Sequence, residues 1–150
     1  MSSLTSQSRW GWLERALAVS AALIAAIISV MVWGAISRQQ AMWPLPDLYL
    51  VEMPAVAGLA ALAVSGGWER RAEVVWAATG VLLGFSLLAG FSIGFFYLPC
   101  VLLLAAAGVK LDWANWRRLA LHLGLAVLWA AAQAALMLAA IRVLYPDAQF

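Results

Sequence analysis

Three side chains that could together bind a ligand, His122, Trp129 and Gln133, recur along the last apolar stretch of the sequence. Their spacing places them on one face of a helix, because an α-helix completes a turn about every 3.6 residues. An imidazole, an indole and an amide on one face could line a cavity for a largely apolar ligand. Since an amide in hydrocarbon needs a hydrogen-bond partner, we expect this face to point into the protein.

The same face is also typical of a helix-packing surface. Ala126, Ala130 and Ala134 form a ridge of small residues beside it. Gly80 and Gly84 supply a GxxxG spacing in an earlier apolar stretch. Small residues at this spacing allow two membrane helices to approach closely. The sequence therefore leaves two interpretations open, a ligand site or a packing seam with one interhelical hydrogen bond.

Two charged residues, Glu52 and Arg142, fall within apolar stretches near their ends. Charged side chains inside a membrane are costly and are functional candidates for that reason. Counted from the ends of their stretches, the two residues share a depth, which predicts an ion pair between them. The alternative is that each long side chain reaches water at the membrane surface by itself.

No pattern typical of catalysis or metal binding accompanies these residues. Cys100 is the single cysteine, which excludes an internal disulfide and a cysteine-cluster metal site. His122 is expected at the opposite depth of the membrane from Cys100, too far for a nucleophile and base in contact. One isolated histidine also makes no metal site. We therefore expect no catalytic residues, no cofactor and no metal. An enzyme that acts inside the membrane is only the third hypothesis, after the two given below.

The amino-acid composition indicates whether water or lipid surrounds the protein. Hydrophobic residues make up 66% of the 150 residues and charged residues 11%, whereas globular proteins average about 25% charged residues. So few charges cannot cover the surface of a water-soluble domain, and the lipid bilayer is the expected surroundings. The net charge of +2 is too small for a nucleic-acid-binding surface.

The apolar stretches predict the number of membrane crossings. They lie at residues 16–37, 48–64, 74–109 and 119–144. The third is too long for a single crossing, since about 20 residues span the hydrocarbon. Gly90-Phe-Ser-Ile-Gly94 near its middle is typical of a tight turn and divides it into 74–89 and 92–109. The sequence therefore predicts one all-α domain, residues 1–150, that is a bundle of five transmembrane helices.

Positive charges predict the orientation of this bundle. With five crossings, one side carries Arg9, Arg15, Arg70, Arg71, Lys110, Arg117 and Arg118, and the other carries only Arg38 and Arg142. Most tryptophans, Trp76 among them, also fall near the predicted membrane surfaces, where indole rings are favoured. Because cytoplasmic loops carry the excess of lysine and arginine, the N-terminus is predicted in the cytoplasm and the C-terminus outside.

Function is constrained mainly by what the sequence lacks. The heavy use of alanine, leucine and arginine suggests a GC-rich bacterial genome, and hence the bacterial inner membrane. The leading hypothesis is a small non-enzymatic multipass protein that acts through helix contacts, either with itself or as an accessory subunit of a membrane complex. The alternative is a small transporter or a binder of an apolar ligand that uses the face of His122, Trp129 and Gln133.

Overall fold

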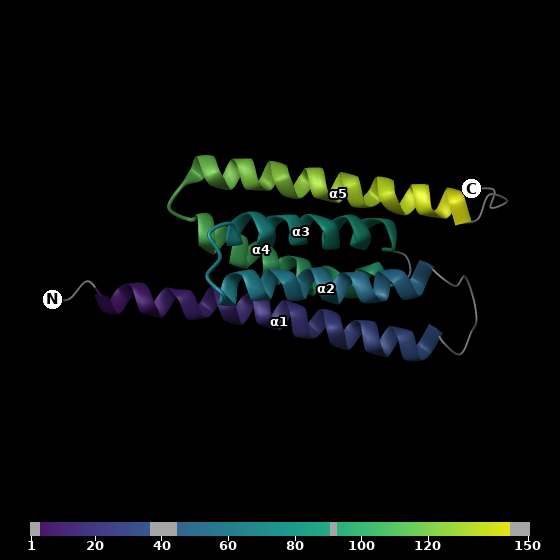
Figure 1. The fold of residues 1–150 in the computed structure, drawn as a ribbon, viewed down its shortest axis with the longest axis horizontal. Helices are drawn as coiled ribbons and strands as arrows, with labels where there is room; N and C mark the ends of the chain where they lie inside the picture. Colours follow the sequence, from purple (N-terminus) through teal and green to yellow (C-terminus); the bar gives the residue numbers. More distant parts are fainter. Residues whose placement is uncertain (1–3, 37–44, 91–92, 145–150) are drawn as a thin grey trace.

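The computed structural model describes residues 4–36, 45–90 and 93–144, which form helices and turns and contain no strand. The long helices are α1 (Leu4–Ile36), α2 (Leu45–Ser65), α3 (Arg71–Leu88), α4 (Leu98–Asp112) and α5 (Trp116–Leu144), and a short 3-10 helix, η1 (Gly94–Tyr97), precedes α4. The helices α1, α2, α3 and α5 each hold a segment that is long and apolar enough to cross a membrane, and η1 with α4 forms another. The predicted all-α bundle of five membrane helices is confirmed (Figure 1).

The helix ends differ from the predicted ranges where polar residues extend a helix beyond its apolar part. The apolar segment of α1 is Gly11–Ala35, but the helix begins earlier, at Leu4. α4 continues to Asp112, past the predicted end of its span. α5 begins at Trp116, directly after Asn115, whose side-chain oxygen accepts hydrogen bonds from the backbone N–H groups of residues 117 and 118. An asparagine in this position is a favourable helix cap.

The long third apolar stretch breaks between α3 and η1, as the paired glycines predict. The backbone N–H of Gly94 donates to the carbonyl of Ala89 over 2.8 Å, which turns the chain back on itself. A Cβ at Gly94 would lie 2.7 Å from the carbonyl carbon of Ala89, so only glycine fits this turn. Pro99 then falls in the first turn of α4, where its missing N–H costs no hydrogen bond.

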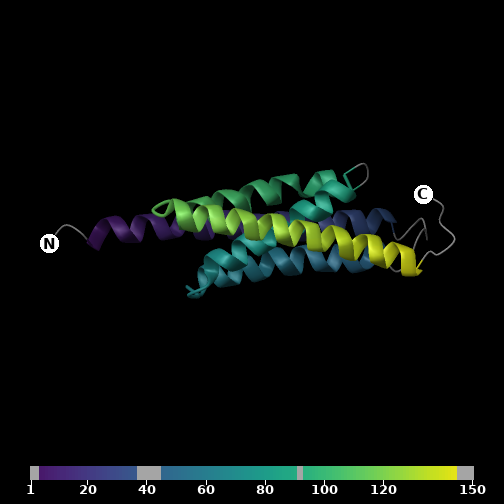
Figure 2. The ribbon, with the colours of Figure 1, turned by 90° about the horizontal axis from the view of Figure 1, so that it is seen from above.

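The first four helices form the bundle, and α5 packs against its outside. α1 contacts α2 and α4, while α3 contacts α2 and α4 from the opposite side. α5 packs mainly on α3. Figure 2 shows α5 crossing the bundle obliquely, so that its first half lies near α4 and its second half nearer α2. This placement lets α5 pack on α3 and hydrogen-bond to α4 and α2.

Small and aromatic side chains fill the centre of the bundle. Ala21 and Ala25 of α1 are fully buried and permit close approach of the neighbouring helices. Phe85 stands edge-on to Tyr97, with 5.4 Å between ring centres. The hydroxyl groups of Tyr97 and Ser29 are 2.7 Å apart, a buried hydrogen bond that joins η1 to α1. Packing and such bonds hold membrane helices together, because lipid is as apolar as the core.

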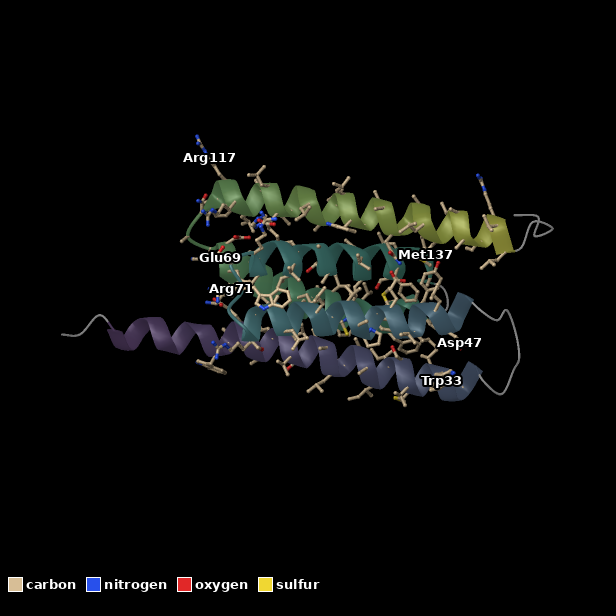
Figure 3. The ribbon with its side chains drawn as sticks, viewed as in Figure 1. Trp33, Asp47, Glu69, Arg71, Arg117 and Met137 are labelled. Carbon is tan, nitrogen blue, oxygen red and sulfur yellow. The ribbon has the colours of Figure 1, made fainter. Side chains whose placement is uncertain are left out.

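The two ends of the bundle differ in charge. One end, called the basic end below, carries the α2–α3 and α4–α5 turns (residues 66–70 and 113–115) with Arg71 and Arg117 beside them. Figure 3 shows both arginines at this end, and Trp33 and Asp47 at the opposite end, called the distal end. Five crossings place the start of α1 and the last turn of α5 at opposite ends of the bundle (Figure 1).

Candidate functional site

A buried carboxylate, Asp112, collects hydrogen bonds from two helices near the basic end. Its Oδ2 accepts a bond from Nε1 of Trp76 in α3 over 2.8 Å. The same oxygen lies 2.6 Å from Nδ1 of His122 in α5. The side chain of Asp112 is only 4% exposed. A carboxylate taken out of water needs such donors, and here they tie α3, α4 and α5 together.

This arrangement orients the ring of His122. Its Nδ1 faces the carboxylate of Asp112, which as an anion accepts a hydrogen bond from Nδ1–H. The imidazole is thereby held in one orientation with Nε2 as its other polar atom. Its side chain is 16% exposed, at the edge of the bundle. The oriented acid–imidazole pair could move a proton, or it could simply fasten α5 to α4.

A second polar contact lies deeper in the bundle. Nε2 of Gln133 in α5 donates to Oε2 of Glu52 in α2 over 3.2 Å. Gln133 is only 4% exposed, so the amide points into the protein, as its need for a partner predicts. The sequence interpretation had named these two residues separately. The structure brings them together across helices that make few other contacts.

The structure does not bring Glu52 and Arg142 together: in the part of the chain that it describes, Glu52 bonds to Gln133 and no ion pair with Arg142 is present. Arg142 is exposed in the last turn of α5. It lies nine residues beyond Gln133, which is about 13 Å further along the helix axis. Its hydrogen bond places Glu52 level with Gln133 and not with Arg142. The carboxylate therefore meets an amide near the middle of α5.

The contact between α3 and α5 lies between these two polar contacts. Gly80 and Gly84 face the backbone of Ala126 and Ala130. A Cβ at Gly80 would overlap the carbonyl oxygen of Ala126, and one at Gly84 would lie 2.5 Å from that of Ala130. The GxxxG spacing of α3 and the alanine ridge of α5 therefore form one seam, in which the two backbones touch.

Trp129 does not join the interior face that was expected of it. Its Cβ borders the seam beside Gly80, yet the residue is 43% exposed. His122 and Gln133 both turn inward and bond to neighbouring helices. The three residues consequently do not line one common cavity wall. The packing interpretation of this face accounts for the contacts that His122 and Gln133 make.

Two residues of the polar contacts were missed by the sequence interpretation. The predicted span ends at residue 109 and leaves Asp112 in the connection that follows, and the sequence predicts Trp76 near the membrane surface. In the structure Asp112 belongs to the last turn of α4, and Trp76 is only 2% exposed. An aspartate and a histidine on either side of a short helix–helix turn were the available signal, because such a turn brings both side chains to the same depth.

A separate cavity of about 380 Å³ lies between α1 and α2 toward the distal end. It is lined by Ala26, Ser29, Val30 and Trp33 of α1 and by Asp47, Leu50, Val51 and Pro54 of α2. Both sets repeat at three- and four-residue steps, so each helix contributes one face over two turns. The lining is mostly aliphatic, with one carboxylate at the end nearest the helix terminus.

Within the described ranges 4–36, 45–90 and 93–144, no three histidine, cysteine, aspartate or glutamate side chains gather where they could hold a metal ion. Cys100 is buried in α4 as a free thiol. Comparison with protein-family models, with curated proteins and with solved structures found no match to this chain.

Proposed function

We propose that this protein is a non-enzymatic multipass membrane protein that acts by associating through α5 with a second copy of itself. The observation that carries the proposal is the outward face of α5. Ala131, Ala135 and Ala139 are exposed there and repeat every four residues. Alanine ridges at this spacing favour close helix contact in a bilayer. On the inner face of the same helix, Ala126 and Ala130 already make such a contact with α3.

The bonding of the polar residues supports a non-enzymatic role. His122 and Gln133 are the polar side chains of α5 that could act on a substrate, and both bond within the chain. Catalysis needs several polar groups that converge on a reacting atom. The alternative, a transporter or binder that uses the face of His122, Trp129 and Gln133, has less support because two of its three residues are already engaged.

The charge distribution and composition support the setting of this role. The excess of arginine and lysine at the basic end favours a cytoplasmic location for that end. The residue usage favours a bacterial inner membrane. In this setting the outward face of α5 would meet its counterpart within the bilayer, with the lipid tails displaced from between the two alanine ridges.

Cysteine crosslinking in native membranes tests the proposal. In a Cys100→Ser background, Ala135→Cys should form a disulfide-linked dimer under mild oxidation. Leu23→Cys is the matched control, because Leu23 is an exposed residue in the middle of α1. Equal crosslinking at both positions, or none at Ala135→Cys, would contradict self-association through α5.

Mild detergent extraction separates self-association from the accessory-subunit hypothesis. A homo-oligomer should elute with this chain as its single component, and Ala131→Leu with Ala135→Leu should shift it toward the monomer without lowering the unfolding temperature. Recovery in a fixed ratio with another membrane protein, together with no Ala135→Cys dimer, would instead identify an accessory subunit.

A further inference from the structure

We infer that the cavity between α1 and α2 is a binding groove for a phospholipid whose headgroup carries a primary ammonium, such as phosphatidylethanolamine. The inference concerns a different face from that of the proposed α5 contact. The groove has the shape for an acyl chain, and its distal end has the charge for an ammonium group.

The shape follows from the two helix faces that form the groove. Ala26 and Pro54 lie at its deep end, and Trp33 and Asp47 at its outer end. Seven residues separate the two ends on each helix, so the groove runs about 10 Å along the helix axes. Its volume of about 380 Å³ lies within the range of small-molecule sites. An acyl chain parallel to the helices fits this elongated apolar space.

The walls of the groove open toward the lipid. Val30 and Val51 form its rims and are 68% and 69% exposed, whereas Leu50 at its floor is buried. A lipid chain can therefore enter sideways from the bilayer without any helix moving. Figure 3 shows Trp33 and Asp47 near one another at the distal end of α1 and α2. The headgroup of the bound lipid would lie at this end, where the membrane surface is.

The charge at the outer end selects the headgroup. Asp47 is the charged residue of the lining and lies in the first turn of α2. Nothing in the described ranges pairs with its carboxylate. The groove thus offers one unpaired carboxylate at its outer end as an acceptor for a hydrogen-bond donor. A primary ammonium supplies N–H groups, whereas a choline headgroup has none. Phosphatidylethanolamine, phosphatidylcholine and phosphatidylglycerol all carry a phosphate, and phosphatidylglycerol has no headgroup cation to offset that charge beside the carboxylate.

Trp33 adds an attraction for a positive headgroup, and Asp47 alone distinguishes the primary ammonium from choline. The indole of Trp33 lies at the outer end with Asp47, and a cation over an indole ring is attracted to the negative face of the ring. Tryptophan is also favoured at the depth of lipid headgroups. Together the indole and the carboxylate form a binding site for one cationic group at the end of the groove where the headgroup would lie.

Native mass spectrometry of the full-length protein tests the inference. The protein is released from mild detergent with equal amounts of phosphatidylethanolamine, phosphatidylcholine and phosphatidylglycerol that carry the same acyl chains. We expect bound phosphatidylethanolamine to exceed each of the others by about threefold, the size of effect that a partly exposed ion pair gives. Equal retention of the three lipids, or a preference for phosphatidylglycerol, would overturn the inference.

Two variants and one control locate the bound lipid. Asp47→Asn should remove the preference while leaving total lipid binding intact. Val51→Trp should fill the groove and lower the retention of all three lipids; an unchanged phosphatidylethanolamine signal would place the lipid elsewhere and overturn the inference. Glu69→Gln is the matched control, since Glu69 is an exposed acid at the basic end, and it should keep the wild-type preference. Because Asp47, Val51 and Glu69 are all at the protein surface or its rim, these variants should fold.

Discussion

Gln133 of α5 donates a hydrogen bond over 3.2 Å to the carboxylate of Glu52 in α2, and this bond joins the fifth helix to a helix that it otherwise barely contacts. Gln133 is buried, and Glu52 is its hydrogen-bond partner. The bond to Asp112 at one side and the bond to Glu52 at the other hold α5 across the face of α3.

The Glu52–Gln133 bond predicts a non-additive pair of substitutions. Glu52→Leu or Gln133→Leu alone should lower the free energy of unfolding by about 1 kcal/mol, because the remaining polar group loses its partner. The double variant should be no worse than either single variant, since it leaves no polar group unsatisfied. Equilibrium unfolding in mixed micelles measures this, and strictly additive losses would contradict the bond.

The glycines of the α3–α5 seam should tolerate alanine less well than a glycine outside the seam. Gly80→Ala and Gly84→Ala should each destabilise the protein by about 1–3 kcal/mol, as overpacking does. The obstacle is the backbone of Ala126 and Ala130, so no side-chain truncation in α5 should relieve it.

Gly58→Ala is the control for these glycine substitutions. A Cβ at Gly58 meets nothing within 4 Å, and alanine is favoured over glycine in a helix by up to about 1 kcal/mol. Thermal unfolding in one detergent compares the three variants. If Gly80→Ala were as stable as Gly58→Ala, the two helices could not be as close as the seam requires.

The hydrogen bonds at Asp112 predict how strongly different substitutions lower the free energy of unfolding. Asp112→Ala should lower the free energy of unfolding by about 2–3 kcal/mol, because it leaves two donors without an acceptor. Trp76→Phe removes one donor and should cost about 1 kcal/mol. Glu69→Ala, an exposed acid at the same end, should stay within about 0.5 kcal/mol of the wild type. An Asp112→Ala variant that behaves like Glu69→Ala would show that the carboxylate does not fasten the helices.

The five crossings predict opposite locations for two reporter fusions. A fusion after residue 115, in the α4–α5 turn, should report the cytoplasm. A fusion after residue 150 should report the outside. Alkaline phosphatase and a fluorescent protein, which are active on opposite sides of the membrane, make the comparison. The same compartment for both would contradict the odd number of crossings, and reversed compartments would contradict the positive-inside assignment.

The crossings and the seam were predictable because both depend on spacing along one helix. Apolar length gave five spans, and the glycines at the middle of residues 74–109 gave the turn. The GxxxG of α3 and the alanine ridge of α5 carry the matching four-residue period that close packing requires. Both the length of an apolar stretch and the spacing of small residues can be seen in a single sequence.

The partners across helices were not predictable in the same way. Depth alone suggested Arg142 for Glu52, but a neighbour must also lie beside the group, and the lateral order of helices is set by packing between them. Counting depth from apolar residues placed Glu52 level with Arg142, whereas its hydrogen bond places it level with Gln133. Counting apolar residues also misplaced Asp112. Its charge excluded it from the apolar stretch, although it belongs to the last turn of α4.

The oblique position of α5 has a consequence for biosynthesis. Its three attachment points, Glu52, Gly80 and Asp112, belong to α2, α3 and α4, all of which are made before it. Chains fold from the N-terminus as they are synthesised, so the surface that receives α5 is complete when α5 emerges. Until then Glu52 and Asp112 lack the donors that α5 supplies. The last helix therefore completes the hydrogen bonds of the bundle. In a chain that stops before α5, the carboxylates of Glu52 and Asp112 lack these bonds.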